Sequence, residues 1–174
     1  MHGQQVLISA SGQIRRTRKI WLRAKKINYT QFFVRHIGPV PYFDVELGKT
    51  VDLRSYLQTD SRKVGISAFM RLKNEEQFVA TTIKSIIDHV DELVIVHNGC
   101  TDRTPEIIES CRLRHPDRIR IFEYKPSVFP PGSVEHRHEP MGSPHSLVNY
   151  YNYALAKTTR KIAIKIDGDE LYLD

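Results

Sequence analysis

The chain has 174 residues, of which 40% are hydrophobic and 26% charged, and its formal net charge is +6. These values describe one globular domain with an appendage, and they exclude wholesale disorder and two full-sized domains. No run of about 18 apolar residues occurs, which excludes a membrane-spanning helix. The positive charge favours anionic partners without choosing among them.

The cysteines and the N-terminus bear on the cellular compartment. Cys100 and Cys111 have no metal-binding spacing, and no uninterrupted apolar segment follows the basic residues near the N-terminus. We therefore expect reduced thiols and a cytoplasmic protein.

Residues 1–61 are predicted to form a basic N-terminal extension. Seven arginines and lysines lie between residues 15 and 26, with apolar residues among them. We favour a solvated helix packed on the main domain; the alternative is an amphipathic helix making peripheral contact with the inner face of a membrane. Residues 28–60, with scattered aromatic residues and turn-forming prolines, are typical of extended or short-strand structure.

Residues 62–174 show a regular alternation of apolar strands and amphipathic helices. Strands are expected at 64–70, 92–97, 118–124 and 161–166, with helices starting at Asn74 and Thr104 and a third at 146–157. Asn74, with Gln77 three residues later, and Thr104, before Pro105, have the residue types of helix N-caps. A long loop with five prolines spans 126–144.

This alternation predicts an α/β fold, a mostly parallel sheet with helices on both faces. Polar clusters at 71–74, 97–99 and 167–169 each follow the end of a strand. Because such sheets bind ligands beyond the carboxyl ends of their strands, we expect the clusters to meet in one crevice.

Three carboxylates, those of Asp167, Asp169 and Glu170, lie within four residues. If the strand continues to Asp169, its alternation places Asp167 and Asp169 on one side, with Gly168 leaving room for a ligand. Two such acids repel unless a cation lies between them, and their oxygens suit Mn²⁺ or Mg²⁺, which bind diphosphates. The alternative is an acidic turn that only ends the strand; the position after a buried strand favours the metal site.

From residue 64 to 174 the sequence resembles family 2 glycosyltransferases, which have the Rossmann-like GT-A fold. It looks closest to the bacterial sugar transferases that build lipopolysaccharide core or capsule polysaccharide. Three motifs in the family's order carry the resemblance: residues 67–76 (SAFMRLKNEE), residues 91–104 (DELVIVHNGCTDRT), and residues 152–157 (NYALAK) followed by 165–170 (KIDGDE).

The resemblance implies a nucleotide-sugar donor, usually a UDP-sugar, a divalent Mn²⁺ or Mg²⁺ ion, and a glycan or lipid-linked acceptor. By motif position, the nucleoside pocket is expected to be lined by Ala68, Phe69 and Arg71, and the base to be contacted by His97 or Asn98. Asp167 is expected to contact the donor, and the metal is expected to be bound by Asp167 and Asp169. The family's acceptor half and catalytic base lie beyond Glu170, so the region is expected to be incomplete at its C-terminal end and the catalytic base is unassigned.

Three positions depart from the family pattern. His97 stands where an aspartate usually accepts a hydrogen bond from the base, and Cys100 replaces the usual serine, a small change. Tyr151 stands where a basic residue often lies near the phosphates; Arg71 or Lys73 would compensate. Because the catalytic base is unassigned, the alternative function is a truncated or degenerate GT-A-like module that binds a nucleotide or nucleotide-sugar without transferring it. Nucleic-acid binding is not expected, because no motif accompanies the basic segment.

Two further groups of residues are predicted to have structural or solvent-exposed roles. Tyr150, Tyr151 and Tyr153 are expected to pack the third helix against the sheet. His136 and His138 fall on one side if the loop is extended, yet without a third ligand nearby we expect exposed histidines there. Arg137 and His138 are further candidates for ligand contact.

Overall fold

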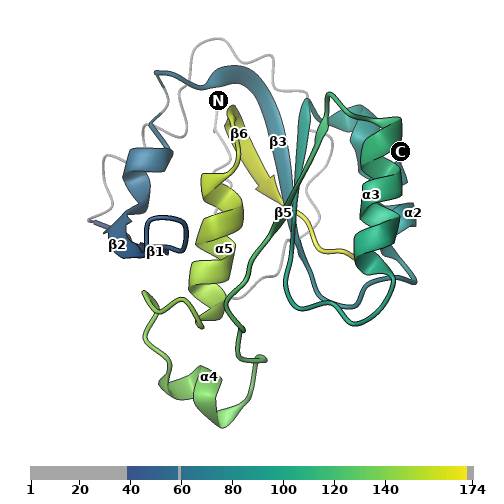
Figure 1. The fold of residues 1–174 in the computed structure, drawn as a ribbon. Helices are drawn as coiled ribbons and strands as arrows, with labels where there is room; N and C mark the ends of the chain where they lie inside the picture. The colour runs from purple at the N-terminus through teal and green to yellow at the C-terminus, as the bar shows by residue number, and fades with distance from the viewer. Residues whose placement is uncertain (1–38, 59, 172–174) are drawn as a thin grey trace, which may run out of the picture.

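The computed structural model describes residues 39–58 and 60–171 (Figure 1). Its elements in chain order are β1 (Pro41–Asp44), β2 (Lys49–Asp52), η1 (Leu53–Tyr56), β3 (Lys63–Leu72), α2 (Val79–Ile86), η2 (Ile87–His89), β4 (Glu92–His97), α3 (Thr104–Arg114), β5 (Ile119–Glu123), α4 (Val134–His138), α5 (Leu147–Ala156) and β6 (Arg160–Lys165). The predicted basic helix at 15–26, and the membrane contact that depends on it, lie outside these residues.

Four of the strands form one parallel sheet in the order β5-β4-β3-β6. β3 comes first in the chain, β4 and β5 are added on one side of it, and β6 returns to the other side. The chain therefore changes direction across the β3–β6 pair, and open α/β sheets bind ligands at such a switch point. The predicted α/β fold with a parallel sheet is confirmed.

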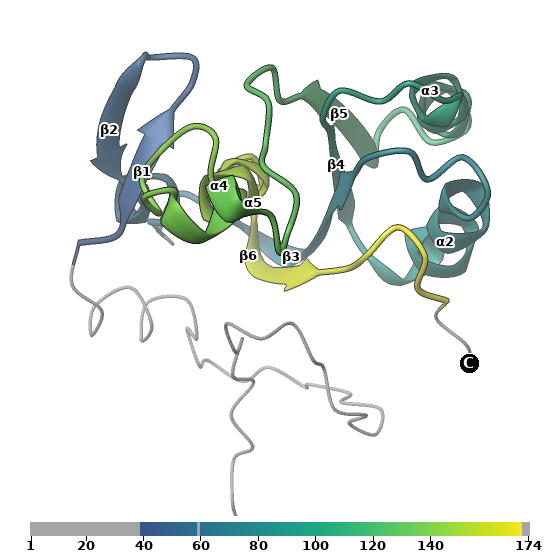
Figure 2. The ribbon, with the colours of Figure 1, turned by 90° about the horizontal axis from the view of Figure 1, so that it is seen from below.

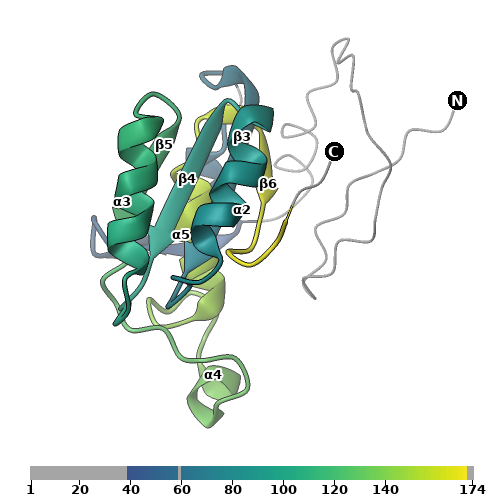
Figure 3. The same ribbon diagram turned by 90° about the vertical axis from the view of Figure 1, so that its right-hand side faces the viewer.

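Helices cover both faces of this sheet, so the central strands β3 and β4 are buried on both sides. α2 and α3 lie side by side on one face, while α5 and the β1–β2 hairpin lie on the other (Figures 2 and 3). Along β3 the alternation is clear: Ala68 and Met70 are buried beneath α2, and Phe69 is buried on the α5 side.

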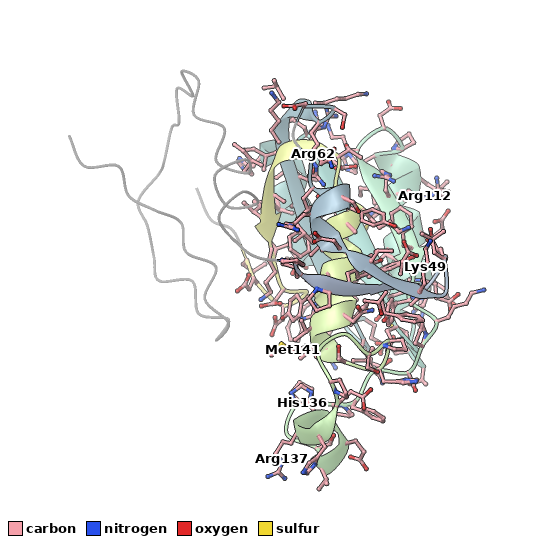
Figure 4. All side chains as sticks on the ribbon, turned by 90° about the vertical axis from the view of Figure 1, so that its left-hand side faces the viewer. Lys49, Arg62, Arg112, His136, Arg137 and Met141 are labelled. Carbon is pink, nitrogen blue, oxygen red and sulfur yellow. The ribbon has the colours of Figure 1, made fainter. Side chains whose placement is uncertain are left out.

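Buried polar side chains form hydrogen bonds that join the β1–β2 hairpin and the segment after it to α5 and β6. The Asn149 side chain on α5 accepts from the backbone N–H of Phe43 at 2.7 Å and donates to the Phe43 carbonyl at 2.9 Å. Arg62, labelled in Figure 4, donates to the carbonyl oxygens of Tyr56 and Arg160. The short strands expected within 28–60 are confirmed at β1 and β2.

The expected helix starts were wrong in detail. α2 begins at Val79, because Asn74 adopts a left-handed backbone (φ 58°) and its side chain bonds to Thr101 rather than to its own helix. α3 includes Thr104 as its first residue; the Thr104 hydroxyl accepts a hydrogen bond from the N–H of Glu75, and Asp102 accepts from the N–H of Thr104. Both polar side chains thus join neighbouring loops.

The loop expected at 126–144 contains the short helix α4, whose N-cap Ser133 accepts from the N–H of His136. Residues two apart on a helix do not face each other, so His136 and His138 do not lie on one side, and His138 is exposed as expected. α4 projects from the body, and Figure 4 shows His136 and Arg137 at this end of the molecule. Within the described residues, no helix combines the length and apolar character that a membrane crossing requires.

Candidate functional site at the ends of β3 and β6

The three polar clusters that follow the strands meet at the carboxyl edge of the sheet, as expected. The backbone N–H of Asn98 donates to the Leu72 carbonyl at 3.1 Å, which joins the ends of β3 and β4. The Thr82 hydroxyl on α2 donates to the Gly168 carbonyl at 2.7 Å. The turn after β6 is thereby held against the start of α2, beside the switch point.

The acidic cluster lies in this turn and not on a strand. β6 ends at Lys165, and the turn closes when the Asp167 N–H donates to the Glu170 carboxylate at 3.2 Å. The expected continuation of the strand to Asp169 was wrong, because the backbone there bonds to the turn instead of to β3. Asp169 is exposed and Asp167 is partly exposed.

Gly168 serves packing inside the protein. It is buried, and a Cβ atom at this position would lie 2.5 Å from Cδ2 of Leu72 and 3.2 Å from Cγ of Glu75. The space that glycine leaves is therefore filled by the end of β3 and the following loop, and the expectation that it leaves room for a ligand was wrong.

A second group of charged side chains lies on the α5 side of the switch point. The β3–β6 register pairs Phe69 with Lys165, so Arg71, two residues further along β3, lies on the same side. Asp167, in the turn after β6, is close enough to act on the charge of Arg71. The ammonium of Lys165 forms an ion pair with the Asp167 carboxylate. Lys165 was not expected in the site; its position two residues before Asp167 on a strand was the signal for it.

The guanidinium of Arg71 packs on aromatic rings. Its central carbon lies 3.1 Å from the centroid of the Tyr151 ring and 5.1 Å from that of Tyr150. Burial lowers the pKa of Arg71, and the nearby tyrosines and Asp167 oppose that effect. An arginine nonetheless stays charged at neutral pH.

No carboxylate in the described part of the chain forms an ion pair with Arg71. Largely buried charges in proteins are normally paired, because an uncompensated one is costly to desolvate. Arg71 therefore offers a desolvated positive charge, with planar donor geometry, to an anion at the switch point.

Carboxylates gather on the α2 side of the same corner. Burial raises the pKa of Glu75, and the carboxylates of Asp169, Asp102 and Asp167 raise it further. Glu75 belongs to the first motif, residues 67–76, but no role in the site was predicted for it from the sequence. Its position directly after the end of β3 was the signal for a site residue.

These oxygen donors fit a divalent metal ion of the Mg²⁺ or Mn²⁺ type. Within residues 39–58 and 60–171 no group of three or more His, Cys, Asp or Glu side chains is arranged to hold a metal. One or two carboxylates, with phosphate oxygens and water completing the shell, are the usual arrangement for Mg²⁺. The residues present fit that open type of site and not a closed protein cage.

The other predicted site residues differ in how far their side chains are exposed. Ala68 and Phe69 are buried in the two cores, so their side chains present no surface to a ligand. The Asn98 amide is also buried and donates to the carbonyls of Tyr124 at 2.6 Å and Pro126 at 2.8 Å. His97 is partly exposed at the end of β4 and remains the candidate for contact with a base.

The tyrosines of α5 divide between packing and the site. The Tyr150 hydroxyl donates to the Val96 carbonyl at 2.8 Å and the Tyr153 ring is buried, which confirms their packing role. Tyr151 is half-buried, and its ring packs against the guanidinium of Arg71. Cys111 is buried, Cys100 is half-buried, and both are free thiols.

The segment that supplies most of this edge matches a known protein family. Residues 67–125 match the model of Glycosyl transferase family 2. The resemblance seen in the sequence is thereby confirmed for β3 to β5, and the turn with Asp167 lies beyond the matched residues.

Two solved structures are similar to this chain. One is Staphylococcus aureus TarS 1–349 in complex with UDP, at 19% identity and a TM-score of 0.40, over 60% of this chain and 27% of that one. The other is a mycobacterial protein at 18% identity and a TM-score of 0.40, over 78% of this chain and 42% of that one. The chain spans less than half the length of either. No curated protein matches the sequence.

Proposed function

We propose that the chain binds a nucleotide-sugar, of the UDP-sugar class, as the donor of a glycosyl transfer to a glycan or lipid-linked acceptor. The donor's diphosphate would lie beyond the carboxyl ends of β3 and β6, with the base toward His97. The observation that carries the proposal is Arg71, a largely buried guanidinium on the Tyr151 ring that has no carboxylate partner among the described residues.

Topology supports this location independently of the side chains. β6 lies on the opposite side of β3 from β4, so the switch point of the sheet lies between the ends of β3 and β6. Arg71 lies at the end of β3, and the Asp167 turn follows β6. A diphosphate there would meet a guanidinium that has no ion-pair partner among the described residues.

A divalent ion, Mn²⁺ or Mg²⁺, is proposed at Asp169 with Asp167. Asp169 is exposed, and its carboxylate is close enough to Glu75 to raise the pKa of that residue. A cation would relieve this repulsion and, when bound, neutralise charge on the nucleoside diphosphate leaving group. The chain's own task is to orient the diphosphate between Arg71 and this turn.

Titration calorimetry with UDP in the presence of Mn²⁺ tests the proposal. Arg71→Gln removes the unpaired charge and should weaken binding about 10-fold to 100-fold, the range for a charged hydrogen bond. Arg112→Gln, a partly exposed arginine on α3 paired with Glu109, is the matched control and should bind UDP as the parent does. Equal affinities for the parent and Arg71→Gln would refute the site.

A second pair of variants tests the proposed metal site. Asp169→Asn should reduce the gain in UDP affinity that Mn²⁺ provides, while Asp117→Asn, an exposed aspartate before β5, should not. UDP binding that does not respond to Mn²⁺ in the parent would rule out the metal site and leave the nucleotide site standing. Binding of a UDP-sugar without release of UDP in the presence of acceptors would favour the non-transferring module.

A further inference from the structure

We propose that Lys165 and Arg71 form a cationic pair that binds the diphosphate directly, with Lys165 bridging the Asp167 carboxylate to the phosphate oxygens. Lys165 would thus occupy, in part, the role that a divalent ion has between an acidic residue and a nucleotide. The identity of the ligand rests on the proposed function; the inference adds the side chains that neutralise its charge.

Both cations lie over one aromatic ring. The Arg71 guanidinium carbon is 3.1 Å from the Tyr151 centroid and the Lys165 nitrogen is 5.9 Å from it, so the two charges are no further apart than the sum of these distances. They come from neighbouring parallel strands, where the register places Lys165 beside Phe69, two residues before Arg71. Their closeness is therefore set by the sheet and not by mobile loops.

The charges on this side do not balance. Asp167 is the carboxylate that pairs with Lys165, and it also acts electrostatically on Arg71. On the α5 side of the switch point two cations thus face one carboxylate, while the carboxylates of Glu75 and Asp169 lie on the α2 side. The Lys165 side chain is 18% exposed, so its ammonium is partly desolvated and attracts a nearby anion more strongly than the ammonium of a surface lysine does.

The chemistry of the two groups suits a diphosphate. An ammonium has three donor hydrogens, so Lys165 can keep Asp167 and still donate to phosphate oxygens. The guanidinium of Arg71 presents planar donors that match phosphate oxygens, and the Tyr151 ring holds it by cation–π attraction. Since Asp167 already has a cation, a divalent ion there must compete with Lys165, and Asp169 becomes the principal metal carboxylate.

We therefore expect the chain to retain a large part of its affinity for a diphosphate when no metal is present. Calorimetry of the 174-residue chain with inorganic pyrophosphate, UDP and uridine, each in EDTA and in Mn²⁺, separates the contributions. In EDTA the parent should bind pyrophosphate, and Lys165→Met should weaken that binding about 10-fold or more. Lys161→Met, on the same strand at its opposite end, should bind as the parent does.

A second variant tests the cationic pair even if Lys165→Met is poorly folded. Asp167→Asn removes the carboxylate that shares Lys165, so it should retain or strengthen pyrophosphate binding in EDTA. Loss of that binding in Asp167→Asn, with an unchanged melting temperature, would contradict the cationic pair.

The outcomes distinguish this inference from the proposed function. If pyrophosphate and UDP bind only with Mn²⁺, and Lys165→Met equals the parent, the cationic pair is refuted and the donor site stands. If pyrophosphate binds through Lys165 but UDP binds no more tightly, the cationic pair stands and the nucleotide-sugar function fails. If no probe binds under either condition, both are refuted.

Discussion

The hydroxyl of Thr82, in the middle of α2, donates a hydrogen bond of 2.7 Å to the carbonyl oxygen of Gly168. Thr82 is fully buried, and the bond holds the acidic turn after β6 in place from the opposite face of the sheet. A buried side chain of α2 therefore helps to set the position of Asp167 and Asp169.

Thr82→Val should lower both stability and nucleotide affinity. The change leaves the Gly168 carbonyl without its donor, which costs about 1–3 kcal/mol of unfolding free energy. Urea unfolding and UDP calorimetry with Mn²⁺ check the two effects. Thr81→Val, at the exposed neighbouring position, is the control; if both variants behave alike, the hydrogen bond has no special role.

Gly168→Ala should be destabilising although both residues are small. The added Cβ would lie 2.5 Å from Leu72 Cδ2, and Leu72 is buried, so its side chain must move within a packed core. We expect a loss of about 1–2 kcal/mol in urea unfolding, as for other overpacked sites.

Gly142→Ala is the matched control for this change. Its Cβ would lie 3.7 Å from Cβ of Pro41, an ordinary contact, and we expect a change within about 0.5 kcal/mol. A Gly168→Ala variant as stable as Gly142→Ala would show that the turn can move away from β3 at no cost.

His97 and Asn98 are adjacent, yet their substitutions should separate binding from stability. Asn98→Ala leaves the buried carbonyls of Tyr124 and Pro126 without donors, and we expect a loss of about 2–3 kcal/mol in unfolding free energy. His97→Ala should leave stability unchanged and weaken UDP binding relative to pyrophosphate binding. The reverse pattern would remove His97 from the site.

Glu92→Gln should show a stability loss that depends on pH. Burial acts to raise the pKa of Glu92, but hydrogen bonds from Ser67, Arg120 and the Thr159 N–H bring that pKa below its usual value. Because the folded pKa is below the unfolded value of about 4.3, the carboxylate stabilises the fold above that pH. The contribution is lost as the pH falls through the folded pKa.

Urea unfolding at pH 7 should therefore show Glu92→Gln less stable than the parent by about 1–3 kcal/mol, with the difference shrinking toward pH 3. Glu123→Gln, at an exposed position of β5, should show neither effect. A difference that is constant over this pH range would mean that packing, and not the charge, is the cause.

The layered fold was predictable because apolar runs and helical stripes are properties of the sequence itself. β4 and β5 were located within one residue, and the third helix, expected at 146–157, is α5 at Leu147–Ala156. The start of α2 was not, because the Asn74 side chain bonds to Thr101 of another loop, and such tertiary hydrogen bonds override local capping preference.

The site was predictable as a location but only partly as a set of residues. The ends of the strands had to meet once the sheet was parallel, so the corner holding Arg71 and Asp167 followed from topology. Ala68 and Phe69 could not be separated from Arg71 by motif position alone, since their burial depends on how helices cover the sheet. Lys165 and Glu75 lie next to predicted site residues in the sequence, but the strand pairing and the loop contacts are needed to show that their side chains reach the site.

The return of β6 to the open side of β3 has a consequence for folding. The residues that would hold the diphosphate come from strands separated by all of α2, β4, α3, β5 and α5 in the chain. Such non-local pairing forms slowly, because a long loop must close before its contacts stabilise it. The binding corner is therefore assembled late among the described elements, and a bound nucleotide would slow hydrogen exchange most strongly in β6, the strand whose docking completes it.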